Sequence, residues 1–261
     1  MLNSDLRKKI VDIVYNSREG HIPSSFSIVD IINYLYEHVL NIDPKNYKSS
    51  LRDFFILSKG HGAAALYVVL NKFGFVSEKD LKLYSKSGGI LGGHPDVTKV
   101  PGVEASTGSL GHGFPMAAGL ALGLKIQKKT NKVICLLGDG ECHEGTIWET
   151  ALVSKNLKLG NLVAIVDYNG SAAQILPLEP FKQKWDSFGF ETYEIDGHNF
   201  NDLENVFSKL EYNLDGKPKV IIANTVKGKG VSFIEGHGKW HHRIPNEEEM
   251  IKIAKELYEN N

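Results

Sequence analysis

The sequence predicts an α/β fold in which a doubly wound, mostly parallel sheet carries helices on both faces. Two observations support this prediction. Short apolar runs recur along the 261 residues without alternating polar positions, which is typical of strands that are buried on both faces. Helical patterns separate these runs, as the crossovers between parallel strands require. We therefore expect ligands to bind at the carboxyl ends of the strands.

Five segments are expected to be strands and seven to be helices. The first helix is typical: Leu6, Ile10, Ile13 and Val14 fall on one face at helical spacing. The strands are chosen as continuous apolar runs bounded by turn residues. The expected strands are 53–57, 133–137, 162–167, a segment near 190–195, and 220–223; the expected helices are 5–16, 28–40, 63–74, 78–84, 114–125, 146–157 and 247–258.

Two segments are expected to be loops. Residues 18–27, REGHIPSSFS, are too polar and too rich in glycine, proline and serine for a helix. Residues 85–111 are rich in glycine and exceed the roughly 15 residues beyond which a structureless loop is uncommon in a compact domain. Such long loops are functional or disordered. This one has little of the charge density of disorder, so we expect it to be functional.

Composition and charge are those of an ordinary globular protein, and the length suits one large α/β domain or two small ones. The strand pattern favours one domain spanning residues 1–261. The net charge of −1 and the pI near 6.8 argue against a nucleic-acid or membrane-surface partner. No apolar stretch approaches the ~20 residues that cross a membrane, and the N-terminus lacks the apolar core of a signal peptide. We expect a cytoplasmic protein. Its two cysteines, Cys135 and Cys142, exclude a disulfide framework, and Cys135 is expected to be buried.

Asp139 stands between two glycines directly after an expected strand, in the segment LLGDGECHEG. Thirty residues later the next strand ends in DYNGS, which puts Asn169 at the same edge of the sheet. A carboxylate and an amide oxygen are suitable ligands for Mg²⁺, which also takes phosphate oxygens. The helix that begins near residue 144 can offer backbone N–H groups to an anion. These residues therefore predict a diphosphate bound with its metal ion.

These motifs are also compatible with other interpretations. Asp139 alone fits a helix cap equally well, and Asn169 fits a turn. The glycine-lysine segment 227–230 lacks the GxxxxGK[ST] pattern of a nucleoside triphosphatase. The three histidines of 237–242 could indicate zinc, but no helix is expected through them and no thiolate lies near in the sequence.

Five other histidines divide into two groups. A lone histidine is more often a hydrogen-bonded structural residue than a ligand, which is the expectation for His38 and His198. His21, His61 and His94 instead lie in loops flanked by glycine or proline, where functional groups concentrate. Neutral imidazole offers one donor and one acceptor, which suits a substrate with several hydroxyl groups.

Six segments resemble the N-terminal half of transketolase, in order and across nearly the whole chain. GDGECHEG, with DYN following thirty residues after its aspartate, also resembles the thiamine diphosphate signature of that family. The resemblance implies the diphosphate-binding domain of the thiamine-diphosphate-binding fold. It implies thiamine diphosphate with Mg²⁺ as cofactors, with Ca²⁺ or Mn²⁺ as substitutes. The six segments are REGHIP, LSKGHGAAALY, GGHPD, PGVEASTGSLGHG, LKLGNLVAIVDYN and TVKGKG.

The resemblance also implies which residues bind the metal. Asp139, Asn169 and the backbone carbonyl near Ser171 match the metal ligands of the family. Glu144 and Glu149 match carboxylates at a subunit interface that links two active sites. After DYN, however, this chain has NGSAAQILPLEP where the family has N-x-x-Q-I-D-G, so the third ligand is assigned to within one residue.

The substrate and cofactor contacts follow from the same resemblance. Histidines are implied to line a channel above the thiazolium, bind sugar hydroxyls and take part in catalysis. His112 replaces a more frequent glutamine, and WHHRIP offers two histidines, of which His241 is chosen over His242. The implied catalytic residues are His21, His94 and His241, and the implied cofactor contacts are His61, Gly108, Leu110, Gly140, Glu144 and His241.

The glutamate that acts on the cofactor's pyrimidine ring, and the arginines that bind sugar phosphate, belong to a second domain of the family. The resemblance therefore implies a split transketolase. This chain is the diphosphate-binding subunit, and a C-terminal transketolase subunit carries the pyrimidine-binding domain in an α₂β₂ assembly. The expected reaction transfers a two-carbon ketol unit from a ketose or ketose phosphate to an aldose.

Two other hypotheses remain open at this point. The chain could be a subunit of another thiamine-diphosphate enzyme, a 2-oxo acid dehydrogenase of the α type or a deoxyxylulose-phosphate-synthase-like enzyme. The loop histidines argue against that assignment, because a 2-oxo acid requires cationic anchors. The chain could also be a non-catalytic subunit that binds the cofactor without turnover.

Overall fold

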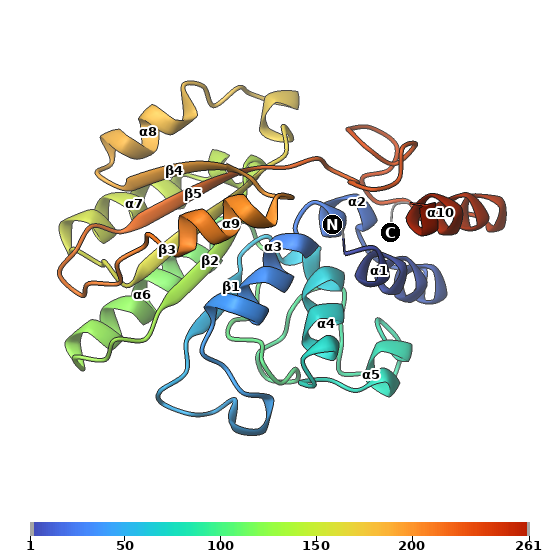
Figure 1. Ribbon diagram of the computed structural model, residues 1–261, viewed down its shortest axis with the longest axis horizontal. Coiled ribbons are helices and arrows are strands. Elements are labelled where there is room, and N and C mark those ends of the chain that lie inside the picture. The colour runs from blue at the N-terminus through green and yellow to red at the C-terminus, as the bar shows by residue number, and fades with distance from the viewer. Residues whose placement is uncertain (1–2, 260–261) are drawn as a thin grey trace.

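A five-stranded parallel sheet lies at the centre of the computed structural model, which describes residues 3–259. The strand order is β1-β2-β3-β5-β4 (Figure 1). One row of paired residues shows the register: Leu57 of the first strand pairs with Leu136, Leu136 with Ile165, and Ile165 with Ile221. The predicted parallel sheet is confirmed. The strands are β1 (Phe54–Leu57), β2 (Val133–Gly138), β3 (Leu162–Tyr168), β4 (Glu191–Asp196) and β5 (Lys219–Asn224).

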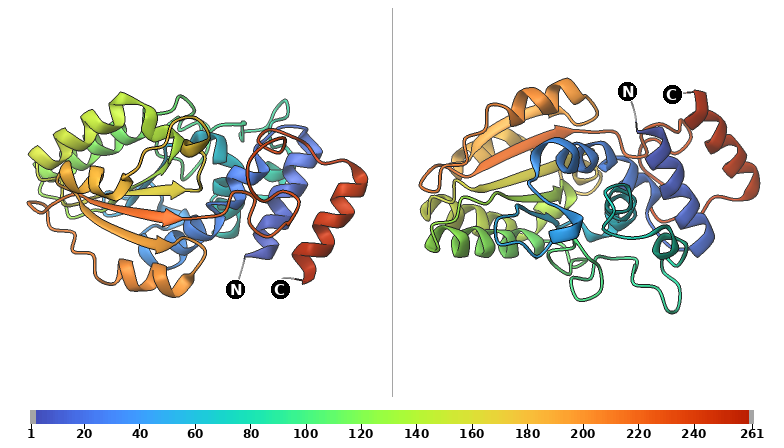
Figure 2. Two further views of the ribbon diagram at one scale, coloured as in Figure 1. Left: turned by 90° about the horizontal axis from the view of Figure 1, so that it is seen from above. Right: turned by 60° about the horizontal axis from the view of Figure 1, so that its bottom comes forward.

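Helices cover both faces of this sheet (Figures 1 and 2). Alternate strand residues enter two separate cores: in β2, Ile134 and Leu136 enter one, and Cys135 and Leu137 enter the other. The first core contains residues of α1 (Ser4–Ser17), α2 (Ile22–Phe26), α3 (Val29–Tyr34), α4 (Ala63–Lys72), α5 (Glu78–Lys82), α9 (Phe200–Phe207) and α10 (Glu247–Glu259); the second contains residues of α6 (Gly113–Ile126), α7 (Gly145–Asn156) and α8 (Phe181–Ser187).

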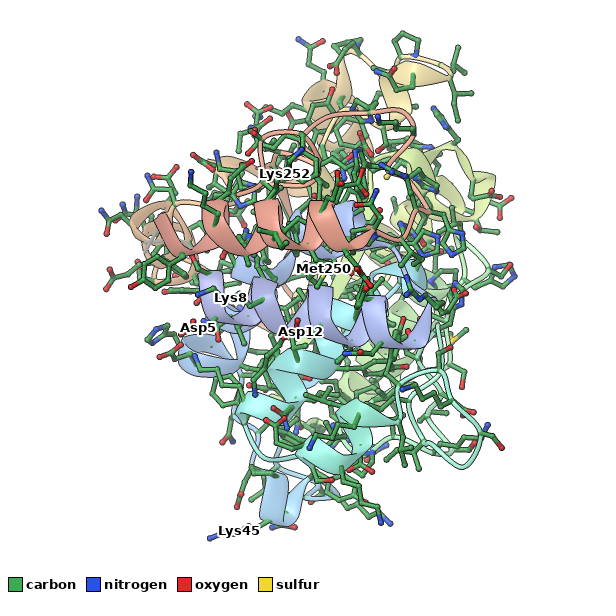
Figure 3. The ribbon with its side chains drawn as sticks, turned by 90° about the vertical axis from the view of Figure 1, so that its right-hand side faces the viewer. Asp5, Lys8, Asp12, Lys45, Met250 and Lys252 are labelled. Atoms are coloured by element: carbon green, nitrogen blue, oxygen red, sulfur yellow. The ribbon has the colours of Figure 1, made fainter. Side chains whose placement is uncertain are left out.

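The helix expected over 28–40 is present, although its last turn is a π-helix, Leu35–Val39. The final helix α10 packs along α1, so that segments from opposite ends of the sequence lie side by side (Figure 3). Its residues Ile253 and Leu257 are buried. No helix among residues 3–259 is both long enough and apolar enough to cross a membrane.

The prediction of a loop over 18–27 is wrong for its second half, which forms α2. Pro23 lies in the first turn of this helix, where its missing N–H costs no hydrogen bond. The helix is buried, and the hydroxyl of Ser27 donates to the carbonyl oxygen of Ser24. Serines that are hydrogen-bonded in this way can be buried, so a polar composition did not mean an exposed loop here.

Two other helices lie where no element was predicted. In α9, Leu203, Val206 and Phe207 are buried at helical spacing, and the side chain of Asn199 caps the first turn. The short helix α8 buries Phe181 and Trp185, one turn apart. Each has only two or three buried apolar residues, which is too short a pattern to stand out in the sequence.

Strand β4 does not share the continuous apolar pattern of the other strands. Glu191, Glu194 and Asp196 are exposed, and the other three residues of the strand are only half-buried. This strand lies at the edge of the sheet, where charged side chains discourage pairing with another chain. The expected absence of alternation therefore holds for β1, β2, β3 and β5 only.

The long loop between α5 and α6 contains no helix or strand, as predicted. Two hydrogen bonds fix it to the carboxyl edge of the sheet. The Thr107 hydroxyl donates to the carbonyl oxygen of Leu57 at 2.7 Å, and the backbone N–H of Gly111 donates to Glu141 Oε1 at 2.9 Å. The loop is therefore an ordered wall beside the ends of β1 and β2.

Candidate active site

Asp139 follows β2 directly and is almost completely buried, at 1 % exposure. Its Oδ1 accepts the N–H of Gly140 at 2.7 Å, and its Oδ2 accepts the N–H of Ala172 at 3.1 Å. Burial raises the pKa of this carboxyl, and the nearby charge of Asp167 adds to that effect. Burial makes the ionised form of this carboxyl less favourable, and a cation bound beside it would stabilise that form.

Asn169 follows β3, the neighbouring strand, as expected. Its Nδ2 donates to Asp167 Oδ2 at 2.9 Å, which directs Oδ1 the other way. There Oδ1 accepts from the backbone N–H of Ser171 at 3.1 Å and from its hydroxyl at 2.6 Å. The carbonyl oxygen of Ser171 accepts the N–H of Gln174 at 3.3 Å. The predicted metal ligands Asp139, Asn169 and Ser171 thus lie on two adjacent turns.

The predicted metal site has the donor chemistry of an oxygen-binding cation. Among residues 3–259, no group of three or more His, Cys, Asp or Glu side chains is placed to hold a metal ion. The set found here is one carboxylate, one amide oxygen and one backbone carbonyl. The carboxylate oxygens and the carbonyl each have a lone pair beyond their present hydrogen bonds, and the amide oxygen would exchange its bond from the Ser171 hydroxyl for a metal ion. That combination suits Mg²⁺ or Ca²⁺ and is poor for zinc.

A buried ion pair between Lys59 and Asp167 lies beneath these turns, and the sequence reasoning missed it. Lys59 Nζ is 2.5 Å from Asp167 Oδ2, and the two side chains are 2 % and 0 % exposed. Asp167 also accepts the hydroxyls of Ser27 and Thr225. All of its partners are internal, so Asp167 orients Asn169 and does not remain available as a ligand.

Lys227 is the second buried lysine at the site and was also missed. Its Nζ contacts Ser171 Oγ at 3.2 Å and His241 Nδ1 at 3.1 Å, both of which are uncharged. Burial lowers the pKa of this lysine, and the charge of Lys59 lowers it further. Within the described part of the chain no carboxylate forms a salt bridge with Lys227. The only sequence signal was its position in TVKGKG, a segment to which no role was given.

Four histidines from three distant segments form a cluster above these groups. The ring centroids of His21 and His61 are 5.4 Å apart, as are those of His21 and His241, while His61 and His241 are 6.4 Å apart. His242 lies closest to His21, at 4.5 Å, and its Nε2 is 3.3 Å from a carboxylate oxygen of Glu19. His241 contacts Lys227 and therefore faces the interior of the site.

Burial keeps His61 and His21 uncharged at neutral pH. It lowers the pKa of His61 to about 2 and that of His21 to about 4, and neighbouring cationic groups add to both shifts. His94 is among the groups that lower the pKa of His21, which places it beside the cluster. Nδ1 of His21 is buried and has no hydrogen-bond partner among the described residues. That atom is free to bond a ligand hydroxyl.

The predicted cofactor contacts on the loop and on the turn after β2 also lie near the site. A Cβ at Gly108 would be 2.9 Å from the His94 ring, so this glycine packs directly under that imidazole. Leu110 is half-buried, and Gly140 donates its N–H to Asp139. Glu144 and Glu149 are exposed on the first turns of α7. Their expected roles require groups outside this chain.

Glu141 has a structural role that the sequence did not indicate. It is buried, and its Oε1 accepts the Ser58 hydroxyl at 2.5 Å and the N–H of Gly111 at 2.9 Å. Its Oε2 accepts the N–H of Gly138 at 3.1 Å. This carboxylate therefore joins the ends of β1 and β2 to the long loop, and it holds the 108–111 segment against the sheet.

Comparison with known proteins gives a consistent result. The family described as "Transketolase, thiamine diphosphate binding domain" matches residues 2–261. The chain is 44 % identical over 259 residues to one subunit of the apulose-4-phosphate transketolase of Actinobacillus succinogenes, covering 97 % of this chain and 93 % of that protein. It is 39 % identical over 258 residues to the protein of the same name from Phocaeicola vulgatus, of which it covers 91 %.

Undivided transketolases are similar over a smaller share of their length. The human transketolase is 33 % identical over 259 residues, which is 41 % of that protein. The crystal structure of transketolase from Campylobacter jejuni superposes with a TM-score of 0.90 at 30 % identity, and it matches 98 % of this chain and 42 % of that one. The chain thus spans less than half of the undivided enzymes.

The lowered pKa of His21 predicts that acid destabilises the fold. Between pH 6.5, the ordinary pKa of histidine, and about 4, the unfolded chain binds a proton that the folded chain does not bind at His21. The free energy of unfolding should therefore fall as the pH decreases through this window. His21→Gln should reduce the slope, as measured by urea unfolding, with His38→Gln on the exposed surface as control. An NMR titration showing His21 protonated at pH 6 would contradict this prediction.

Proposed function

This chain belongs to the transketolase family as its thiamine diphosphate-binding subunit, and we propose that it transfers a two-carbon ketol unit from a ketose phosphate to an aldose together with a partner chain. The relatives that it covers by 91 % and 93 % are each named as one subunit of an enzyme, which implies a second subunit. The simplest symmetric assembly of two such chains is α₂β₂. The partner is proposed to carry the pyrimidine-binding domain.

The observation that carries the proposal is the charge arrangement at the carboxyl edge of the sheet. Among the described residues, the Asp139 carboxylate is buried with only backbone N–H groups as hydrogen-bond partners, and Lys227 is buried among neutral partners. A metal ion beside Asp139 and a diphosphate between that metal and Lys227 would compensate both charges. We assign Asp139, the Asn169 amide oxygen and the Ser171 carbonyl to the metal. We assign Lys227, His61 and the backbone near Gly140 to the diphosphate.

The histidine cluster is assigned to the sugar. When bound, thiamine diphosphate supplies a carbanion that attacks a ketose carbonyl and an electron sink for the charge that results. The chain's own task is to hold the polyol. His21, His94 and His241 can each accept or donate a hydrogen bond while neutral, and the lowered pKa values of His21 and His241 keep those two rings uncharged.

The substrate class is proposed from the relatives. Two of them are named for apulose 4-phosphate, and a third, 37 % identical over 254 residues, is "6-deoxy-6-sulfo-D-fructose transketolase subunit SqwG" of a Clostridium species. These sugars carry a phosphate or a sulfonate. We propose that the donor here is likewise a sugar with an anionic group, bound at that end by the partner chain.

The function is tested with this chain, its partner and the mixture in a ketol-transfer assay with thiamine diphosphate and Mg²⁺. Apulose 4-phosphate, 6-deoxy-6-sulfofructose and xylulose 5-phosphate are offered as donors. Turnover is expected only in the mixture, because each chain supplies half of the cofactor site. Light scattering on the mixture should give the mass of two copies of each chain. Turnover by this chain alone would overturn the two-subunit proposal.

Asp139→Ala should abolish metal-dependent binding of thiamine diphosphate. Removal of the carboxylate takes away a charged metal ligand, so the diphosphate charge is left without compensation. Calorimetry on the assembled complex, with Mg²⁺ present or removed by EDTA, measures the effect. Asp215→Ala, which removes an exposed carboxylate in the loop before β5, is the matched control and should bind the cofactor normally. Unchanged affinity in Asp139→Ala would show that the metal lies elsewhere.

His94→Ala should lower kcat/KM for the ketose donor by about 10- to 100-fold, the range expected when one or two hydrogen bonds to the substrate are lost. Affinity for thiamine diphosphate should change little, since the proposed bond is to the sugar and not to the diphosphate. Steady-state kinetics at saturating cofactor and calorimetry separate the two effects. Loss of cofactor affinity with full activity at saturation would instead make His94 a cofactor ligand.

A further inference from the structure

A buried trio of charged and polar side chains lies outside the groups assigned above. Arg7 of α1 makes a bidentate contact with Asp30 of α3, at 2.9 Å and 2.6 Å, and these side chains are 0 % and 1 % exposed. His198, in the turn after β4, places its Nδ1 2.8 Å from the same Asp30 oxygen that accepts the shorter of these bonds. Elements from both ends of the sequence thus meet at one carboxylate.

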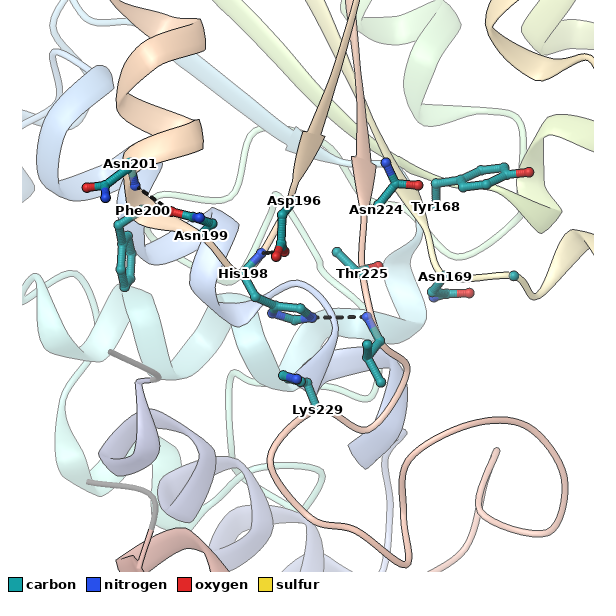
Figure 4. A pocket seen from close by; sticks show the side chains of 12 residues that line it. Tyr168, Asn169, Asp196, His198, Asn199, Phe200, Asn201, Asn224, Thr225 and Lys229 are labelled. Carbon is teal, nitrogen blue, oxygen red and sulfur yellow. Dashed lines mark hydrogen bonds between the residues drawn. The ribbon is translucent and has the colours of Figure 1, made fainter.

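The trio holds the backbone on both sides of Lys227. Val226 directly precedes Lys227, and its N–H donates to Nε2 of His198 at 3.0 Å (Figure 4). Lys229 follows Lys227 by two residues, and its carbonyl oxygen accepts a hydrogen bond from Nε of Arg7 at 2.8 Å. Between these points, the N–H of Gly228 donates to the carbonyl oxygen of Pro23 in α2.

The hydrogen bonds also fix the charge state of the trio. Because the Val226 N–H needs an acceptor, Nε2 of His198 is unprotonated and the hydrogen lies on Nδ1, which donates to Asp30. Burial alone would raise the pKa of Asp30, but the bonds from Arg7 and His198 hold it below its usual value. The trio is therefore a neutral imidazole on a buried ion pair.

The segment that carries Lys227 needs such a restraint. Gly228 and Gly230 both have positive φ, at 83° and 102°, so the chain here has the freedom of glycine and few side chains of its own to pack. The lysine side chain is long and flexible, and its Nζ contacts only Ser171 Oγ and His241 Nδ1 among the described residues. When the backbone of residues 226–229 is fixed, the ammonium group of Lys227 can reach fewer positions.

We propose that Arg7, Asp30 and His198 are positioning residues that hold Lys227 against the diphosphate of the cofactor. The inference rests on the proposed function, because it takes the diphosphate site as given. His198 does not touch the cofactor in this arrangement and acts through the Val226 N–H. Its outer side forms part of the wall of a solvent-open cavity of about 920 Å³, lined also by Asn199, Thr225 and Lys229. The polar groups of that cavity are largely bonded internally, so it is not assigned a ligand.

The test is a double-mutant cycle on the assembled two-subunit complex, with inorganic pyrophosphate and Mg²⁺ as the probe. Calorimetry compares the wild type, His198→Phe, Lys227→Met and the double variant. His198→Phe should weaken pyrophosphate binding about tenfold, and Lys227→Met at least as much, as expected for loss of a charge-assisted bond. The double variant should bind as Lys227→Met does, within about twofold, because His198 acts only through that lysine.

Three further measurements separate positioning from a purely structural role. His198→Gln keeps an acceptor for the Val226 N–H and should bind within about threefold of the wild type. In ketol-transfer kinetics, His198→Phe should raise the KM for thiamine diphosphate and leave kcat at saturating cofactor nearly unchanged. Asp53→Asn weakens a buried ion pair with Lys132 at the opposite edge of the sheet, so it is the control for lost stability without loss of affinity.

The outcomes are distinct. Additive losses in the double variant, or full affinity in His198→Phe, would overturn the positioning role, provided that Asp139→Ala still abolishes binding. If Asp139→Ala binds pyrophosphate and Mg²⁺ like the wild type, the proposed function fails at its metal site instead. Should His198→Phe not assemble, Arg7→Lys takes its place in the same cycle. It keeps the charge beside Asp30 and cannot make the bidentate contact.

Discussion

The carboxylate of Asp167 is the interaction on which the functional edge of this molecule depends. It is 0 % exposed at the end of the central strand β3, and a charge in that position is unstable without partners on every side. Those partners come from four places: Lys59 after β1, Ser27 beside α2, Asn169 after β3 and Thr225 after β5. Removing one partner of a buried ion pair typically costs about 3–5 kcal/mol. The hydrogen bonds and the ion pair that Asp167 needs therefore hold the ends of β1, β3 and β5 in fixed positions relative to one another.

Some charged groups of the site have a charged or fully hydrogen-bonded partner set within the protein, and others do not. The first kind stabilises the fold, and the second kind is what we propose binds the ligand. Asp167 and Lys59 neutralise each other, and Glu141 is bonded to the Ser58 hydroxyl and two backbone N–H groups. Asp139 and Lys227 are buried nearly as deeply, but neither has an oppositely charged partner in contact among the described residues. A buried charge without a charged partner is costly, and a ligand of opposite charge would lower that cost, as we propose for these two groups.

Much of this edge could be predicted from local patterns. Apolar runs gave the strands of the parallel sheet, and their ends gave Asp139 and Asn169 without any structure. Lys59 and Lys227 could not be found in this way, because a lysine beside glycine in a sequence is ordinarily solvated. Only the meeting of distant segments buries them. The same limit applies to His198. It was expected to be a hydrogen-bonded structural residue, and it is hydrogen-bonded. Its connection to Lys227, however, depends on the pairing of β4 with β5 and could not be predicted from local sequence.

Gly108 has a consequence for experiments that vary His94, a residue that we propose binds the sugar. Its φ of 153° disfavours any other residue, and a Cβ there would press on the His94 ring at 2.9 Å. A library that varies position 108 therefore also varies the orientation of His94, even when residue 94 is left untouched. In directed evolution the two positions are best randomised as a pair. In natural relatives that have a residue other than glycine at position 108, the side chain at position 94 should be smaller than that of histidine or differently oriented.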